Sequence, residues 1–217
     1  MTRVTITLED GQMPHVHVTD GVRERRYQLP LETLVERLHD DSASSRPWTT
    51  SPLLPPQTVF WAGRGSEQCW VGDLPAAAYP WVLEGSREST VIPLPRLLFF
   101  LKQRDTHIIQ AAIVAVADNA PLQPDTPLYR YPLSNVYENT TCCWTVPHRP
   151  YTPADWPSLV RIFFSTPNNW DLTHQTNRSG LDYRGLVAAL STRSVFPPEW
   201  LQPLGFPWST WITSLLT

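Results

Sequence analysis

Twenty-three prolines, spread through a chain of 217 residues, constrain what this sequence can fold into more than any other feature. Proline fixes φ and has no amide hydrogen, so it interrupts helices and is excluded from the middle of sheets. The prolines therefore predict short helices and strands joined by rigid, irregular segments. Hydrophobic residues make up 41% of the chain and charged residues 17%, which is typical of a packed globular protein rather than a disordered one.

The hydrophobic pattern places strands before helices. Residues 58–118 hold short apolar or alternating runs separated by turn signals, which predicts an antiparallel β-meander. Helices are expected from Thr152, from Leu181 and over residues 208–216. The predicted fold class is α+β, a meander packed against helices. The side chains predicted to be buried on the first two helices are Leu159, Val160, Phe163 and Phe164, and Leu181, Leu186, Val187 and Leu190.

The chain before residue 58 forms a smaller pattern of its own. Alternating residues predict strands over 3–8, 15–18 and 26–29, and leucines at helical spacing predict a helix that begins near Pro30. Residues 41–57 are rich in serine, threonine and proline and are interpreted as a connecting loop. We therefore divide the chain into an N-terminal strand–helix extension, residues 1–45, and a core domain, residues 46–217.

Charge and composition argue against several classes of protein. A net charge of −3 makes a nucleic-acid partner unlikely, because such surfaces need a basic excess. No apolar run approaches the roughly 20 residues of a membrane-spanning helix, and the first residues do not resemble a signal peptide. We therefore expect a cytoplasmic protein with no membrane partner. Three cysteines, an odd number, indicate reduced thiols rather than a disulfide framework.

The segment from Pro121 to Pro150 carries the candidate chemistry. It holds Cys142 and Cys143 in a frame of prolines and aromatics, and Asn135 lies eight positions before Cys143. A cysteine thiolate is a strong nucleophile, and attack on a thioester creates an oxyanion that a fixed amide can stabilise. An asparagine at this distance can fold back across a turn, and residues 138–140 are turn-like. We interpret the whole segment as a long ordered loop.

These residues resemble the active-site stretch of ubiquitin-conjugating enzymes, in which His-Pro-Asn precedes the catalytic cysteine by eight positions, counted from the asparagine. The wider order of motifs is similar to PRTRC system protein B, a prokaryotic ubiquitin-conjugating-like family, over roughly residues 52–180. The matching stretches are Phe60-Trp61, Pro95 to Phe100, Ala111 to Ala117, Thr126 to Tyr129, Pro132 to Val136 and Cys143.

The resemblance implies a ubiquitin-conjugating-like fold and a transferase that carries a ubiquitin-like protein as a thioester on Cys143, with Asn135 supporting the oxyanion. It also implies two partners, a ThiF-like activating enzyme and the ubiquitin-like protein. The sequence departs from the family pattern at three places. Leu133-Ser134 replaces His-Pro, Thr140 stands where a turn glycine is common, and Thr145 stands where this branch often has glycine after the cysteine.

Other readings remain open for the same residues. Cys143 can be a buried hydrophobic residue, and Asn135 can cap a turn. Cys142 is expected to face the core, but it can take the role of nucleophile in place of Cys143. The whole domain can serve as a non-catalytic adaptor or structural subunit. A Cys143–His148 pair would instead suit a hydrolase. Further possible neighbours of the site are Tyr137, Asp155 and Asp125.

No cofactor or metal is expected. The glycines of Gly63-Arg64-Gly65 lack the strand–loop–helix context of a phosphate-binding loop. His15 and His17 lie on one face of a predicted strand without further ligands nearby, so a solvated strand face is the simpler interpretation. Cys69 lies in an apolar run and is expected to be buried.

Overall fold

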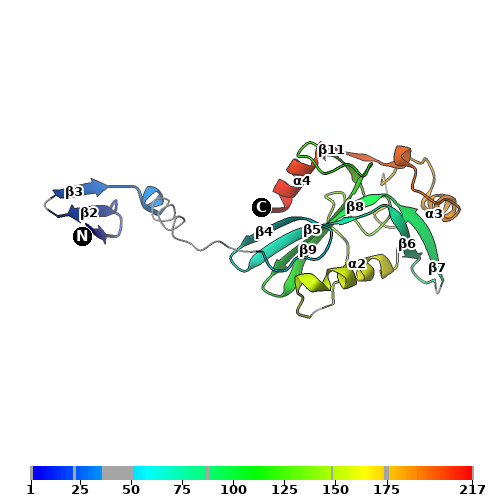
Figure 1. Ribbon diagram of the computed structural model, residues 1–217, viewed down its shortest axis with the longest axis horizontal. Coiled ribbons are helices and arrows are strands. Elements are labelled where there is room, and N and C mark those ends of the chain that lie inside the picture. The colour runs from blue at the N-terminus through cyan, green and yellow to red at the C-terminus, as the bar shows by residue number, and fades with distance from the viewer. Residues whose placement is uncertain are drawn as a thin grey trace. The chain divides into compact units, whose positions relative to one another are not determined.

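The structure is a computed structural model that describes residues 2–21, 23–35, 51–86, 88–147, 149–173 and 176–216. The chain divides into two compact units, Met1–Thr50 and Ser51–Thr217 (Figure 1), and each is described by itself. The first part of the predicted connecting loop, residues 41–50, lies outside the described residues.

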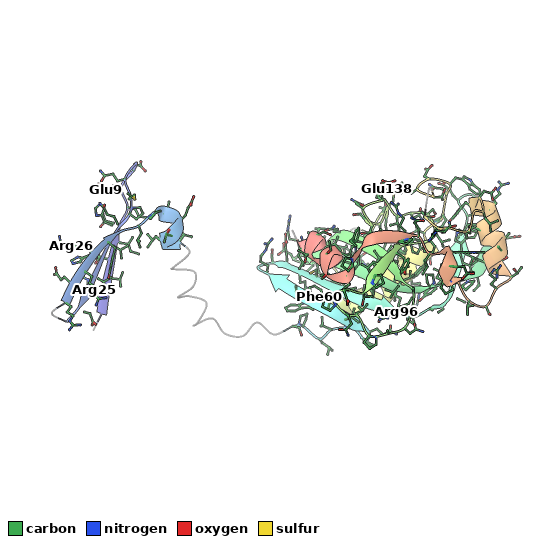
Figure 2. All side chains as sticks on the ribbon, turned by 90° about the horizontal axis from the view of Figure 1, so that it is seen from above. Glu9, Arg25, Arg26, Phe60, Arg96 and Glu138 are labelled. Carbon is green, nitrogen blue, oxygen red and sulfur yellow. The ribbon has the colours of Figure 1, made fainter. Side chains whose placement is uncertain are left out.

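The N-terminal unit is a three-stranded antiparallel sheet in the order β1-β2-β3. Its strands are β1 (Thr2–Thr7), β2 (His15–Asp20) and β3 (Arg23–Gln28), close to the predicted strands. Residues 31–35 are helical, and the rest of the predicted helix lies outside the described residues. Among the described residues of this unit the buried apolar side chains are Pro14, Val16 and Leu34, and Arg25 and Arg26 are exposed on β3 (Figure 2).

The second unit is built on a six-stranded sheet in the order β11-β10-β9-β8-β5-β4, with every neighbouring pair antiparallel. The hairpin predicted around residues 63–66 joins β4 to β5. The strands are β4 (Thr58–Arg64), β5 (Glu67–Leu74), β8 (Arg96–Arg104), β9 (His107–Val116), β10 (Pro127–Arg130) and β11 (Pro203–Pro207).

The expected continuous meander is wrong at one point. Strand β5 pairs with β8, whereas β6 (Ala77–Val82) and β7 (Ser89–Leu94) form a separate two-stranded sheet. Pro95 separates β7 from β8 and has no amide hydrogen to continue a ladder. The Arg96 guanidinium forms a two-pronged hydrogen bond with the Asp73 carboxylate, at 2.8 and 2.6 Å, which joins the start of β8 to the end of β5.

The interpretation of residues 121–150 as loop throughout is also wrong. Residues Pro127–Arg130 form β10, which pairs with β9 on one side and with β11 on the other. The sequence pattern predicted neither strand, because each is four or five residues long and contains proline. A strand of the main sheet therefore lies between Pro121 and the candidate cysteines.

Alternating residues of the sheet divide into two hydrophobic clusters. On β8, for example, Leu97, Phe99 and Leu101 belong to one cluster, and Leu98 and Phe100 to the other. The first cluster includes buried residues of α2 (Trp156–Ser165) and α3 (Tyr183–Ser191), and the second includes those of α4 (Trp208–Leu216). The sheet is thus covered on both faces, with α2 and α4 on opposite sides in Figure 1.

The helices lie where the sequence predicted them. Short 3₁₀ turns, Pro153–Asp155 and Pro198–Trp200, precede α2 and β11. Trp156 at the start of α2 packs against β5 so closely that a Cβ at Gly72 would overlap its indole. Two details differ from prediction, because Leu181 is exposed and Val160 is only partly buried. In the described part of the chain, no helix is long and apolar enough to cross a membrane.

Candidate active site

Cys142 and Cys143 differ sharply in their surroundings. Cys142 is buried, at 8% exposure, and belongs to the cluster beneath α2, whereas Cys143 is exposed. Burial raises the pKa of Cys142 well above its ordinary value. Cys69 is buried as well, and burial also raises its pKa. Cys143 is therefore the accessible thiol of the three, and its neighbour faces the core as expected for a short extended segment.

Residues 135–143 fold into a tight hairpin that brings Asn135 beside Cys143. The Cys143 amide donates to the Asn135 carbonyl at 2.7 Å, and Val136 bridges Cys142. Closer to the tip, the Tyr137 amide donates to the carbonyl of Thr141 at 2.9 Å. The spacing of eight positions thus corresponds to direct backbone pairing.

Tyr137 contacts the candidate nucleophile with its side chain. Its hydroxyl donates to Cys143 Sγ at 3.2 Å. This hydrogen bond, together with the charge that the sulfur carries as a thiolate, raises the pKa of Tyr137. The phenol therefore remains a protonated donor toward the sulfur. Glu138 follows at the exposed tip of the turn (Figure 2).

The Asn135 side chain is directed elsewhere in this state. It is 9% exposed, and its Nδ2 donates to the Pro167 carbonyl at 3.2 Å. An amide nitrogen carries two hydrogens, and this contact uses one of them. Asn135 also has a φ of 66°, a left-handed conformation that asparagine adopts more readily than most residues. The cavity beside it measures about 10 Å³, which is no larger than a single water site.

A buried polar network supports the backbone just before Asn135. Ser134 is fully buried, and its hydroxyl donates to Asn168 Oδ1 at 2.8 Å and lies 3.1 Å from the Tyr183 hydroxyl. Tyr183 in turn donates to the same oxygen at 3.3 Å and accepts from Trp81 Nε1 at 3.1 Å. Burial raises the pKa of Tyr183, which keeps it a neutral donor. Ser134, at the position of proline in the His-Pro-Asn pattern, is thus held in place by hydrogen bonds of its side chain.

Two further predicted neighbours, Asp155 and Asp125, have other surroundings. Asp155 caps the helix start, where its carboxylate accepts from the Thr152 amide at 2.9 Å and pairs with Arg149 at 3.1 Å. Asp125 is exposed in the turn before β10. His148 lies outside the described residues, so the cysteine–histidine hypothesis stays a prediction.

The predicted strand histidines have ordinary partners. Gln28 lies 3.1 Å from His15 Nε2, and His17 lies 3.5 Å from the Glu24 carboxylate. Within the described ranges no group of three or more histidine, cysteine or acidic side chains is arranged to hold a metal ion.

Sequence reasoning missed one contact to the hairpin. Thr140 has a φ of 71° and is 3% exposed, and Trp211 Nε1 on α4 donates to its hydroxyl at 2.8 Å. The only sequence signal was that Thr140 occupies a position where glycine is common. Nothing in the sequence connects this position to a tryptophan 71 residues later.

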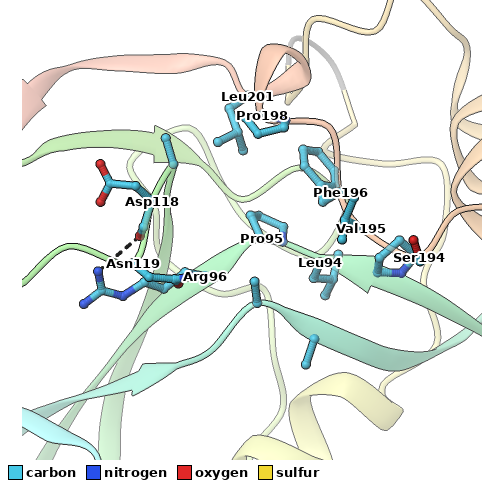
Figure 3. Close-up of a pocket in the computed structure, with 14 residues that line it drawn as sticks. Leu94, Pro95, Arg96, Asp118, Asn119, Ser194, Val195, Phe196, Pro198 and Leu201 are labelled. Carbon is cyan, nitrogen blue, oxygen red and sulfur yellow. Dashed lines mark hydrogen bonds between the residues drawn. The ribbon is translucent and has the colours of Figure 1, made fainter.

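A larger cavity is lined by residues outside the hairpin. It measures about 180 Å³ and has an apolar wall that includes Leu94, Phe196 and Leu201 (Figure 3). Arg96 at its edge is fixed by Asp73 and donates to the carbonyls of Asp118 and Ala120. None of its lining residues belongs to the hairpin 135–143.

Comparison with known proteins gives one match. A model of prokaryotic E2 family D matches residues 31–204, which include the six-stranded sheet up to the start of β11, the hairpin and α2 and α3. No curated protein and no solved structure matches the chain. The family match covers most of the chain and agrees with its mixed architecture of antiparallel sheets and few helices. The chain belongs to prokaryotic E2 family D.

Proposed function

We propose that this protein is a ubiquitin-conjugating-like transferase that carries a ubiquitin-like protein as a thioester on Cys143. The observation that carries the proposal is the exposed Cys143 sulfur, which accepts a hydrogen bond from Tyr137 at the mouth of a hairpin shared with Asn135. Membership of an E2 family supports the same reading. We further propose that the domain has the ubiquitin-conjugating fold and is related to PRTRC system protein B, on the order of motifs described above.

The chemistry proceeds in two transfers. The Cys143 thiolate attacks the carbonyl carbon of the carrier's C-terminus, which a ThiF-like activating enzyme holds as a thioester. A new S–C bond forms at Cys143 as the S–C bond to the activating enzyme breaks, and that enzyme's sulfur leaves as a thiolate. An acceptor amine then attacks the same carbonyl, loses a proton and forms an amide, and the Cys143 thiolate is released.

Tyr137 and Asn135 have separate roles in this proposal. The Tyr137 hydroxyl stabilises the negative Cys143 sulfur before it attacks in the first transfer and after it is released in the second, since hydrogen bonds to a charged acceptor are the stronger ones. Asn135 supplies the second hydrogen of its amide to the oxyanion of each tetrahedral intermediate while the first remains on the Pro167 carbonyl.

The experiment combines the protein with its activating enzyme, the ubiquitin-like protein and ATP, and follows intact mass without and with excess dithiothreitol, a thiol that cleaves thioesters by exchange. We expect an adduct of the carrier's mass that the thiol removes, that Cys143→Ser converts to a thiol-stable ester, and that Cys143→Ala abolishes. Cys142→Ser is the matched control and should retain the thioester. An adduct that forms equally well in Cys143→Ala would refute the nucleophile assignment, and no adduct with competent partners would favour an adaptor.

A further inference from the structure

We propose that Trp211 is a positioning residue for the reaction of Cys143, acting from helix α4 through Thr140. The inference rests on the proposed function, which makes Cys143 the nucleophile. Trp211 lies beyond the residues that match the family model, in the cluster that covers the second face of the sheet. It is 1% exposed, and its indole nitrogen donates to Thr140 Oγ1 at 2.8 Å in a buried contact.

Thr140 needs such a contact because its backbone conformation is unfavourable for its side chain. Its φ of 71° lies in the left-handed region, which crowds Cβ against the backbone and is a genuine outlier for a β-branched residue. The hydrogen bond from Trp211 fixes the threonine hydroxyl and so favours the one arrangement in which the turn closes. Glycine would adopt this φ without strain and without help.

Three hydrogen bonds link the backbone conformation of Thr140 to the surroundings of the Cys143 thiol. The Thr140 amide donates to the Tyr137 carbonyl at 2.9 Å, and its own carbonyl accepts from the Ile113 amide of β9 at 3.0 Å. These bonds place Tyr137, whose hydroxyl donates to the Cys143 sulfur. A change of φ at Thr140 would break both backbone bonds and withdraw the hydroxyl from the sulfur.

The test is a double-mutant cycle with Trp211→Phe and Thr140→Gly, read by amide hydrogen exchange over residues 137–143. Trp211→Phe should speed exchange at Thr140 about fivefold, the factor that corresponds to one lost hydrogen bond. In the Thr140→Gly background the same change should have no further effect, because glycine needs no support. Thr140→Ser keeps the hydroxyl and should behave as the native protein.

A second readout follows the thiol itself, with iodoacetamide as the probe and mass spectrometry to identify the modified cysteine. Trp211→Phe should slow alkylation of Cys143, because the Tyr137 hydroxyl then spends less time on the sulfur, and Tyr137→Phe, which deletes that hydroxyl, sets the limit of the slowing. Trp208→Phe is the matched control, because Trp208 lies on the same helix and its ring packs 5.7 Å from Trp211. Its exchange and alkylation rates should equal those of the native protein.

The outcomes separate this inference from the proposed function. Equal acceleration by Trp211→Phe in the threonine and glycine backgrounds would mean that Trp211 only fills the core, and the inference would be overturned. Thr140→Val provides a second route if Trp211→Phe does not fold, and unchanged exchange in that variant would also overturn it. Failure of thioester formation in the native protein, with the exchange and alkylation results as expected, would refute the transferase and not the positioning of the thiol.

Discussion

The network beneath Asn135 allows a quantitative prediction from two single substitutions. Ser134→Ala removes one hydroxyl, but Asn168 Oδ1 still accepts from Tyr183 at 3.3 Å and Tyr183 still accepts from Trp81. No buried donor is stranded, so the free energy of unfolding should fall by only about 1 kcal/mol, the net value of one hydrogen bond.

Asn168→Ala removes the acceptor that two buried hydroxyls share, together with the two longer bonds, 3.3 and 3.4 Å, that its Nδ2 donates to the Val82 and Thr166 carbonyls. Ser134 and Tyr183 can still bond to each other, since their oxygens lie 3.1 Å apart, and one hydroxyl hydrogen is left without a partner. A stranded buried donor costs about 1–3 kcal/mol, and with one further net bond lost the total is about 2–4 kcal/mol. Asn168→Ala should therefore be at least twice as damaging as Ser134→Ala.

Urea unfolding followed by tryptophan fluorescence measures both values from the shift in midpoint at constant slope. Asn169→Ala is the control, because the Asn169 side chain forms its hydrogen bonds with Asp171, two positions away in the same loop, and its loss should cost little. Equal costs for Ser134→Ala and Asn168→Ala would refute the reasoning, because only Asn168→Ala strands a buried donor and removes the bonds of the Asn168 amide group.

Three further predictions follow from the described contacts. The Thr152 amide and Arg149 lower the pKa of Asp155, so its carboxylate stabilises the fold above its unfolded pKa. Asp155→Asn should lower the free energy of unfolding by about 0.5–1 kcal/mol near neutral pH. This difference from the native protein should vanish as the pH falls through the lowered pKa of Asp155, and thermal unfolding at a series of pH values would measure it. Cys143→Ala should return the pKa of Tyr137 toward its ordinary value in a tyrosine ¹³C NMR titration, and an unchanged pKa would contradict the hydrogen bond. A chain of residues 51–217 should unfold cooperatively, because the buried residues of both hydrophobic clusters all come after position 60. A circular dichroism spectrum with a far-UV signal but no near-UV signal, as in a molten globule, would contradict this.

The sequence predicted local features of the fold well and distant pairings poorly. The β4–β5 hairpin, β9 and the starts of α2 and α4 follow from alternation, turn residues and capping, which act over a few positions. The pairing of β5 with β8 and of β10 with β11 depends on packing between segments far apart in the chain, and the local pattern carries no record of it. The two short proline-containing strands β10 and β11 gave no signal.

The candidate site divides in the same way. The spacing of Asn135 and Cys143 predicted a turn, and the structure has a hairpin there, because backbone pairing is set by the number of residues between them. The partner of the Asn135 amide, Pro167, and the contact between Trp211 and Thr140 arise from tertiary packing. The catalytic roles of these residues remain predictions.

The two adjacent cysteines have one more consequence, which concerns acyl migration and oxidation. Thiols on neighbouring residues can exchange an acyl group or close into a vicinal disulfide when their sulfurs meet. Here Cys142 is held in the core with a raised pKa, while Cys143 stands in solvent, so the two sulfurs belong to different environments. Under the proposed function, an acyl group on Cys143 would have no thiolate at the neighbouring position to which it could migrate, and the buried Cys142 thiol is protected from oxidants that reach the exposed one.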